Sequence, residues 1–348
     1  MPIVGERRAA LILLLLLVLL LVSLPEIGMV KAESKTIVVP DDFPSIQEAI
    51  DYADEGDVVF VKSGIYYQTA IINKSLSLVG ENRETTIIDG NGTTTRVYIE
   101  RDNVTITGFT IRNALVTTEA GILLMRVDYC NISENKLTDN SRGIDLLDSS
   151  YNIIAGNFME ENGAGISLSG FNNSIYGNEI VNCNTGIQIS YGKNNTISEN
   201  NIVNSHKRGI NLPDSQNNSF FLNNIVNSGE YGILFTNSHN NTFIHNNFIN
   251  NVVQVFDSHY VLDWIALSVN IWDNGFEGNY WDNYNGTDGD GNGIGDTPYI
   301  INENNQDNYP LVNVIPEFPS WIILPLFLTA TLVVIFYSER LRMCLRHF

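Results

Sequence analysis

Short stretches of alternating apolar and polar residues recur through the middle of the chain, separated by glycine and asparagine. In GIDLLDS (143–149), Ile144 and Leu146 point to one face and Asp145 points to the other. In NNTISENNI (194–202), Ile197 and Ile202 lie on either side of a bend that contains asparagine. Alternation with a period of two predicts short β-strands with an apolar inner face and a polar outer face. The 3.6-residue spacing of helical repeats is absent, and leucine is too sparse for leucine-rich repeats.

The NNTISENNI phrase recurs at a nearly constant step. One asparagine of each copy falls 21 to 23 residues after the last, at Asn135, Asn157, Asn178, Asn200, Asn223 and Asn246. Gly-Ile phrases with the same step begin at Gly121, Gly143, Gly165, Gly186, Gly209 and Gly232. A fixed period of this size indicates stacked repeats. We therefore predict an all-β fold, a right-handed, single-stranded parallel β-helix of about nine to eleven turns, whose adjacent turns pair about 4.8 Å apart.

The asparagine column has a structural explanation. Each turn must bend between strands, and asparagine tolerates left-handed backbone angles and can hydrogen-bond within its own turn. Because equivalent residues lie above one another in a stack, aligned side-chain amides can also bond from turn to turn as a ladder. A ligand-binding role would need these residues exposed in a cleft, which their spacing does not indicate.

The first and last copies of the repeat define the boundaries of the predicted domain. VTITGFTI (104–111) is an earlier turn with Gly108 in the asparagine column, and NGFEGNYW (274–281) restores the pattern after an insertion within the region 257–270. We assign residues 33–312 to the β-helix domain. Its parts are an N-terminal cap and first turns (36–100), regular repeats (101–250) and irregular last turns (251–312).

A short helix is predicted before the first clear turn. Ser45-Ile46-Gln47-Glu48 has the capping-box pattern, and an apolar stripe at helical spacing follows from Ile46 to Ala53. A β-helix exposes unpaired strand edges at its ends, so we expect this helix to cap the N-terminal end. A partner-binding helix is the alternative.

Both chain ends have the pattern of targeting segments. Residues 1–32 combine basic residues, an apolar run (9–24) and a small-residue cleavage pattern, which predicts a secretory signal, with an uncleaved anchor as the alternative. Residues 313–348 read as a linker, a transmembrane helix (321–337) and a basic tail that faces the cytoplasm. We therefore expect an exported domain on the extracellular face, anchored in the membrane by the C-terminal segment.

The composition of the chain limits the classes of partner that it can bind. The chain has 348 residues and a formal net charge of -20, which opposes nucleic-acid binding because phosphates select basic surfaces. Cys130, Cys183 and Cys344 are too few for a disulfide framework. A bridge between Cys130 and Cys183 is geometrically doubtful if they lie about two repeats apart.

Several segments resemble a known family. VVPDDFPSIQEAIDYADEGDVVFVKSGIY (38–66) and NKSLSLVGE (73–81) resemble the N-terminal part of pectin-lyase-like β-helix proteins. The Asn/Gly turns resemble NosD-like and carbohydrate-binding and sugar-hydrolase (CASH) repeats, and GNYWDNYNGTDGDGNGIGDTPY (278–299) is typical of archaeal surface proteins of the NosD-like group. The PEFP segment (316–319), with the apolar run and arginines after it, resembles archaeal PEF-type sorting tails, whose helix a sortase-like enzyme removes. The resemblance implies the β-helix fold, and it implies copper only through the NosD name.

The most specific local motif is DGDGNGIGD (288–296). Its oxygen-bearing side chains at relative positions 1, 3, 5 and 9, with glycine at 6, match the first nine positions of an EF-hand calcium loop. The predicted ligands are Asp288, Asp290, Asn292 and Asp296. Tyr299 replaces the glutamate at position 12, so we expect weaker binding unless Asp282 or Asp307 completes the shell. The calcium would be structural, and a Gly-Asp turn without metal is the alternative.

Catalytic residues cannot be assigned. The outward residue of each Gly-Ile phrase forms a column of Leu123, Asp145, Ser167, Gln188, Asn211 and Leu234. Glycoside hydrolysis needs two facing carboxylates, and this column holds one. Asp145 beside Arg142, or Glu160 and Glu161 on a neighbouring bend, are the candidates, although a solvated face explains them equally well.

Three other residue types bear on metal binding, sugar stacking and glycan attachment. The five histidines (His206, His239, His245, His259 and His347) fall in different columns and read as isolated rather than as a copper site. The late aromatic residues suit a C-terminal cap better than a sugar-stacking face, and they are Tyr260, Trp264, Trp272, Tyr280, Trp281 and Tyr284. Nine Asn-x-Ser/Thr sequons are possible glycan acceptors in an exported protein, at Asn73, Asn91, Asn103, Asn131, Asn172, Asn194, Asn217, Asn240 and Asn285.

Together these patterns favour a non-catalytic, surface-anchored β-helix that binds glycans or serves as an envelope scaffold. The alternatives are a polysaccharide lyase or glycoside hydrolase and, third, a copper-binding accessory protein.

Overall fold

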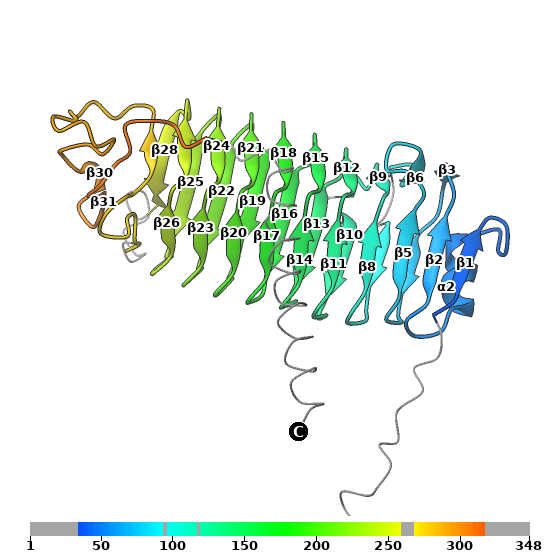
Figure 1. Ribbon diagram of the computed structural model, residues 1–348. Coiled ribbons are helices and arrows are strands. Elements are labelled where there is room, and N and C mark those ends of the chain that lie inside the picture. The colour runs from blue at the N-terminus through cyan, green and yellow to red at the C-terminus, as the bar shows by residue number, and fades with distance from the viewer. Residues whose placement is uncertain (1–33, 93–95, 117–118, 259–267, 317–348) are drawn as a thin grey trace, which may run out of the picture. The chain divides into compact units, whose positions relative to one another are not determined.

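A computed structural model describes residues 34–92, 96–116, 119–258 and 268–316. The chain divides into two compact units, residues 1–35 and 36–348. The described part of the second unit is a right-handed parallel β-helix of about ten turns, so the predicted fold and number of turns are confirmed (Figure 1). The predicted signal segment, transmembrane helix and sorting tail lie outside the described residues. No helix within the described ranges is long and apolar enough to cross a membrane.

Each full turn contributes one strand to each of three parallel sheets, A, B and C, in that order along the chain. Sheet A contains β1 (Thr36–Val39), β2 (Val58–Val61), β5 (Ser77–Gly80), β8 (Thr105–Thr107), β11 (Asn131–Ser133), β14 (Ile153–Ala155), β17 (Ser174–Tyr176), β20 (Thr196–Ser198), β23 (Ser219–Phe221) and β26 (Thr242–Ile244).

Sheet B follows after a tight bend. It contains β3 (Gly64–Tyr66), β6 (Thr86–Asp89), β9 (Thr110–Arg112), β12 (Lys136–Thr138), β15 (Phe158–Glu160), β18 (Glu179–Val181), β21 (Asn201–Val203), β24 (Asn224–Val226), β27 (Asn247–Ile249) and β29 (Tyr280–Trp281).

Sheet C completes each turn. It contains β4 (Ala70–Ile72), β7 (Val97–Ile99), β10 (Ala120–Met125), β13 (Arg142–Leu147), β16 (Ala164–Ser169), β19 (Thr185–Ile189), β22 (Arg208–Pro213), β25 (Tyr231–Thr236) and β28 (Val253–Asp257). A separate antiparallel pair, β30 (Tyr299–Asn302) and β31 (Asn305–Asp307), follows the last turn.

The inner faces of the three sheets form the core. Ile132, Ile154 and Ile175 lie in register in sheet A and are fully buried. Each buried aliphatic side chain contributes roughly 1.5–3 kcal/mol relative to an exposed one. Because the interior is filled along the stack, any ligand must bind on an outer face or at a bend.

Asparagine side chains bond from turn to turn, as expected, but in two long ladders rather than one. The predicted ladder, at the bend between sheets A and B, runs from Asn135 to Asn279. A second ladder at the bend between sheets C and A was missed, and it comprises Asn152, Asn173, Asn195, Asn218, Asn241 and Asn270. In both ladders, the backbone N–H and side-chain Nδ2 of one asparagine donate to the Oδ1 of the next.

The sequence predicted left-handed backbone angles at the ladder asparagines, whereas the structure has them at the preceding residues. In the first ladder, from Asn135 to Asn246, the residue with positive φ is the one before each asparagine, for example Glu134 (φ 57°), Glu199 (φ 56°) and Leu222 (φ 58°). Gly108 takes this left-handed position, and Phe109 occupies the ladder position, where its N–H donates to Asn135. The ladder asparagines therefore serve the stack by hydrogen bonding and not by their backbone conformation.

Strand β31 ends both ladders. Asn305 accepts from the N–H of Asn270 and from the indole of Trp272. Asp307 accepts from the N–H of Asn279 and from the indole of Trp281, at 2.7 and 2.9 Å. Since every ladder bond points from donor to acceptor in the same direction, the last turn needs acceptors, and these two residues supply them.

Aromatic residues fill the end of the core near β31. Phe243 and Trp272 stack at 4.5 Å, and Phe248 and Trp281 stack at 4.3 Å. Both tryptophans are buried, which confirms their assignment to the core end, whereas Tyr260 and Trp264 lie outside the described residues.

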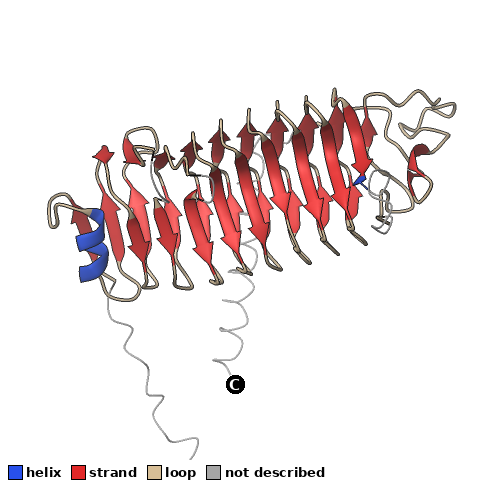
Figure 2. Cartoon of the chain, turned by 180° about the vertical axis from the view of Figure 1, so that it is seen from behind, coloured by secondary structure: helices blue, strands red, loops and turns tan. Residues whose placement is uncertain are grey.

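At the opposite end, helix α2 (Ile46–Tyr52) begins at the predicted N-cap. The Ser45 Oγ accepts a hydrogen bond from the Glu48 N–H. Ile46, Ala49 and Ile50 are buried in the common core, and the helix packs on β1, β2 and β4 (Figure 2).

Candidate functional site

An open groove of about 230 Å³ crosses the outer face of sheet B. Strands β6, β9, β12 and β15, the segment before β6 and the bends that follow β12 and β15 supply its walls. The lining side chains are mostly charged or hydroxylic, and they are Glu84, Ile87, Thr110, Arg112, Lys136, Thr138, Asp139, Glu160 and Glu161. The sequence singled out only the last two of these.

Strand register positions the groove. Lys136 pairs with Thr110 on one side and with Phe158 on the other, while Thr138 pairs with Arg112 and Glu160. Outward side chains of consecutive turns therefore lie about 4.8 Å apart in two parallel columns. Aligning the outward residues of sheet B by register would have found this surface, but the alignment needs the strand boundaries that the sequence leaves open by a residue or more.

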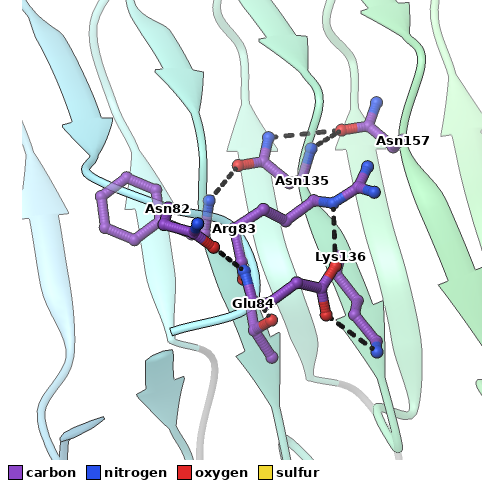
Figure 3. Close-up of polar contacts among 8 residues, drawn as sticks. Asn82, Arg83, Glu84, Asn135, Lys136 and Asn157 are labelled. Carbon is purple, nitrogen blue, oxygen red and sulfur yellow. Dashed lines mark hydrogen bonds and ion pairs between the residues drawn. The ribbon is translucent and has the colours of Figure 1, made fainter. Parts of the chain in front are cut away.

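One wall is held by the segment before β6. Glu84 forms ion pairs with Lys136 and Arg83, both at 3.3 Å, and its N–H donates to Asn82 (Figure 3). The Thr110 hydroxyl donates to the Arg83 carbonyl at 2.6 Å. Asn135, which directly precedes Lys136, bonds to Asn157 on the next turn, so the Lys136 backbone is fixed by the stack.

A second ion pair stiffens the neighbouring column. The Arg112 Nε donates to Asp89 at 2.7 Å, and the Asp89 side chain is only 7% exposed. Burial alone would raise the pKa of Asp89, but hydrogen bonds from Asn113, the Asn91 N–H and Arg112 outweigh it and lower the pKa. Asp89 is therefore ionised and keeps the guanidinium in place along the groove.

The opposite wall is acidic. Asp139 and Glu161 occupy left-handed positions on consecutive bends, with φ of 54° and 55°, and both are exposed. Glu160 faces outward from β15 and is half-buried. Carboxylates at this spacing can accept hydrogen bonds from several hydroxyl groups of an extended ligand, while Lys136 and Arg112 donate. The groove thus offers donors and acceptors on four consecutive turns.

The outward column of sheet C is confirmed, but it does not form a carboxylate pair. Leu123, Asp145, Ser167, Gln188 and Asn211 lie in register. The Asp145 side chain is 1% exposed and forms an ion pair with Arg142 at 2.9 Å. No second carboxylate stands beside it in this column.

Asp145 has an unusual environment. Burial raises its pKa, and the Arg142 charge and the Ser167 hydroxyl offset this effect only in part. Its Oδ1 is buried and has no hydrogen-bond partner in the described structure. Asp145 lies on sheet C and Glu160 on sheet B, so the structure does not bring the three candidate carboxylates together.

The predicted calcium loop is folded around Asp288. Its carboxylate accepts from the N–H groups of Gly291, Asn292 and Gly293 at 2.8–3.1 Å. Asp296 accepts from Gly289 and Thr287. Within the described residues, no three His, Cys, Asp or Glu side chains converge as a metal-binding group, so the aspartates of the loop are not preassembled.

Both residues suggested to complete the calcium shell accept hydrogen bonds from other parts of the closing turn. Asp307 is fully buried and bonded to Asn279, Trp281 and the Tyr309 N–H. Asp282 accepts from the Asn250 N–H and from Gln254. Both carboxylates belong to the closing turn of the β-helix, which the sequence spacing did not reveal.

The donor atoms of the described chain do not fit copper. His245 pairs with Glu277 at 2.8 Å, His239 bonds to Asn237 and the Val269 N–H, and His206 is exposed at a separate bend. Cys130 and Cys183 are buried, unpaired with each other, and their pKa values are raised to about 11 by burial, which disfavours the thiolate that binds metal. His259, His347 and Cys344 lie outside the described residues.

Comparisons with known proteins give a family and a fold. Residues 50–230 and 172–286 match the family described as periplasmic copper-binding protein (NosD). No curated protein sequence matches the chain. The Dettilon tailspike protein (gp208) is similar in structure, with a TM-score of 0.53 and 15% identity over 62% of this chain and 51% of that chain.

A second solved structure has a lower similarity. The A-module of a mannuronan C-5 epimerase from Azotobacter vinelandii gives a TM-score of 0.48 and 13% identity over 65% of this chain and 79% of that module. The chain spans about half the length of the tailspike it resembles, and at this identity the likeness shows the fold alone.

Proposed function

Since the chain belongs to the NosD family, we propose that it is an exported, non-catalytic β-helix protein that binds polysaccharide through the groove on sheet B. The observation that carries this proposal is the groove itself, in which Arg112, Lys136 and Glu160 lie on consecutive strands of one face. An extended polymer of hydroxylated rings can run along such a face and exchange hydrogen bonds with each turn.

The Lys136 ammonium gives the sharpest test. It is half-buried, bonded to Glu84 and 5.6 Å from the Phe158 ring, so it is ordered before any ligand binds. We expect Lys136→Gln to weaken binding about tenfold, or ~1.4 kcal/mol, because one charge-assisted hydrogen bond is lost. The measurement is calorimetric titration with a panel of neutral and uronate polysaccharides.

Lys193→Gln is the matched control, because Lys193 is exposed at the bend between sheets C and A, away from the groove. Equal affinities of the two variants would exclude the sheet B groove. Absence of retention by any polysaccharide would refute glycan binding. Release of unsaturated or reducing ends would instead establish an enzyme of the lyase or hydrolase type.

One observation favours that alternative. Asp145 is a buried carboxyl with a raised pKa beside Arg142, an environment that suits a proton donor. If product release were found, Asp145→Asn would be expected to abolish it while leaving glycan retention by the sheet B groove unchanged. Copper has no place in this proposal, since the described donor atoms do not fit it.

We further propose that Asp288, Asp290, Asn292 and Asp296 bind a structural calcium ion. The loop already turns its amides toward Asp288, and bringing the other three side chains inward would complete an oxygen shell. We expect calcium to raise the melting temperature relative to chelator, and Asp288→Asn to remove the difference. Glu303→Gln, which changes an exposed acid nearby, should keep it. An identical melting temperature with calcium and with chelator would exclude the site.

Export and anchoring complete the proposal. We assign export to residues 1–32 and membrane attachment to residues 321–337, with the β-helix on the extracellular face. Helix α2 would close the N-terminal end of the coil, because its buried residues join the core of the first turns.

A further inference from the structure

Seven residues share one left-handed position at the bend between sheets C and A, each two residues before a strand of sheet A. Their φ angles lie between 56° and 60°. Strand register places them above one another, and in order they are Asn103, Tyr129, Tyr151, Asn172, Asn194, Asn217 and Asn240. We call this set the edge column.

Asparagine in the edge column always occurs with a hydroxyl residue two positions later. The five asparagines are followed at that distance by Thr105, Ser174, Thr196, Ser219 and Thr242. The two tyrosines are followed by Asn131 and Ile153. The bend therefore accepts tyrosine, and the strand accepts residues without a hydroxyl, so the fold does not require the Asn-x-Ser/Thr combination. Its recurrence needs a second explanation.

The side chains of the edge-column asparagines are available. All five are exposed, and in the described structure their side-chain amides make no hydrogen bond to other residues, whereas their backbone N–H groups bond to the next turn. A comparable column at the bend between sheets B and C behaves differently. There Asn204, Asn227 and Asn250 bond to the preceding turn at 3.3, 2.9 and 2.7 Å, and none of them belongs to a sequon. Aligned asparagines in this fold thus pair where no sequon exists and stay unpaired where one does.

We propose that Asn103, Asn172, Asn194, Asn217 and Asn240 are acceptors of N-linked glycans that form a stripe along one edge of the β-helix. This inference rests on the proposed export of the protein. The donor class is an oligosaccharide on a lipid phosphate or pyrophosphate. The bond between asparagine Nδ2 and sugar C1 forms as the bond from C1 to the phosphate oxygen breaks, and the Nδ2 loses a proton.

The stack constrains when and where transfer occurs. The middle residue of four of these sequons is a buried asparagine of the second ladder, Asn173, Asn195, Asn218 or Asn241. A glycosyltransferase cannot bind that residue once the β-helix has folded, so glycan transfer precedes folding. Adjacent turns lie about 4.8 Å apart, so glycans on neighbouring acceptors crowd each other. Asn103, separated from the next acceptor by two tyrosine turns, has the highest expected occupancy.

The test is glycopeptide mass spectrometry on the full chain, produced in the organism that encodes it. Ser219→Ala removes a sequon without changing Asn217, and it should delete one glycan at that site. Asn204→Gln, in the paired column, should leave the glycan pattern unchanged. Fractionation of cells in parallel reports export.

Each outcome decides the matter. Glycans at edge-column sites of the exported protein, lost in Ser219→Ala at Asn217, support the stripe. An exported and folded chain with bare edge-column asparagines overturns it and leaves the proposed function intact. A chain that stays inside the cell overturns export and the stripe together.

Discussion

The turn-to-turn amide ladder makes a quantitative prediction at Asn200. This side chain is 1% exposed, and its Oδ1 accepts from the N–H and Nδ2 of Asn178 at 3.1 and 2.9 Å. Its Nδ2 donates to the Ile175 carbonyl and to Asn223. Asn200→Ala removes all four bonds.

The expected cost follows from the groups left without partners. The Asn178 N–H loses its acceptor, whereas the Asn178 Nδ2 keeps the Ile154 and Tyr176 carbonyls. A buried donor without a partner costs about 1–3 kcal/mol. The Ile175 carbonyl also loses the hydrogen bond from the Asn200 Nδ2, and the shorter alanine side chain leaves a small cavity, so both add to this cost. We expect a loss of roughly 3–5 kcal/mol in the free energy of unfolding, a large part of the 5–15 kcal/mol typical of a domain.

The assay is urea denaturation together with native-state hydrogen exchange. Asn201→Ala is the matched control, because the adjacent Asn201 faces outward from β21 and is half-buried. It should change the free energy of unfolding by less than about 1 kcal/mol. Exchange of the Asn178 amide should accelerate only in Asn200→Ala. Two variants of equal stability would refute the view that the ladder stabilises the stack.

Two further changes test the ends and gaps of the ladders. Burial raises the pKa of Asp307 to about 6, above the value near 3.9 of an unfolded chain. Ionisation of Asp307 therefore destabilises the folded state, and the free energy of unfolding should fall by ~3 kcal/mol as the pH rises from about 4 through 6. Asp307→Asn should flatten this part of a plot of melting temperature against pH. At the bend between sheets B and C, Asn140 donates to Asn162 as in the two long ladders, and the Asn162 Nδ2 donates to the Leu137 carbonyl at 2.8 Å. Toward the next turn, however, Asn162 makes only a weak contact of 4.0 Å with the Cys183 sulfur. Cys183→Asn should restore two ladder bonds there and raise the free energy of unfolding by about 1 kcal/mol in a urea titration; an unchanged midpoint would show that the gap costs nothing.

The repeat period was enough to predict the stack, because every turn must superpose equivalent residues. The same reasoning placed Asn135 and Asn200 in a ladder and the core aromatics at the C-terminal end. It misplaced Gly108 by one residue, since adjacent positions at a bend, one left-handed and one facing inward, look alike in sequence when both tolerate asparagine.

The surface was far less predictable. Groove residues such as Glu84 and Lys136 are 52 positions apart in the chain, and only exact strand register brings them together. Asp307 was a suggested metal ligand, whereas the structure buries its carboxylate and uses it as an acceptor for the Asn279 N–H and the Trp281 indole. Periodicity reports which residues share a column, and it does not report what lies beside them.

The common direction of the ladder bonds makes the coil modular in its middle and fixed at its end. A turn removed or duplicated between Asn157 and Asn246 would leave each amide with an equivalent neighbour, so members of this architecture can change length by whole repeats. Strand β31 has no such substitute, because only Asn305 and Asp307 receive the last donors. Shortened versions for expression should therefore be made by deleting internal repeats and retaining the segment through residue 307.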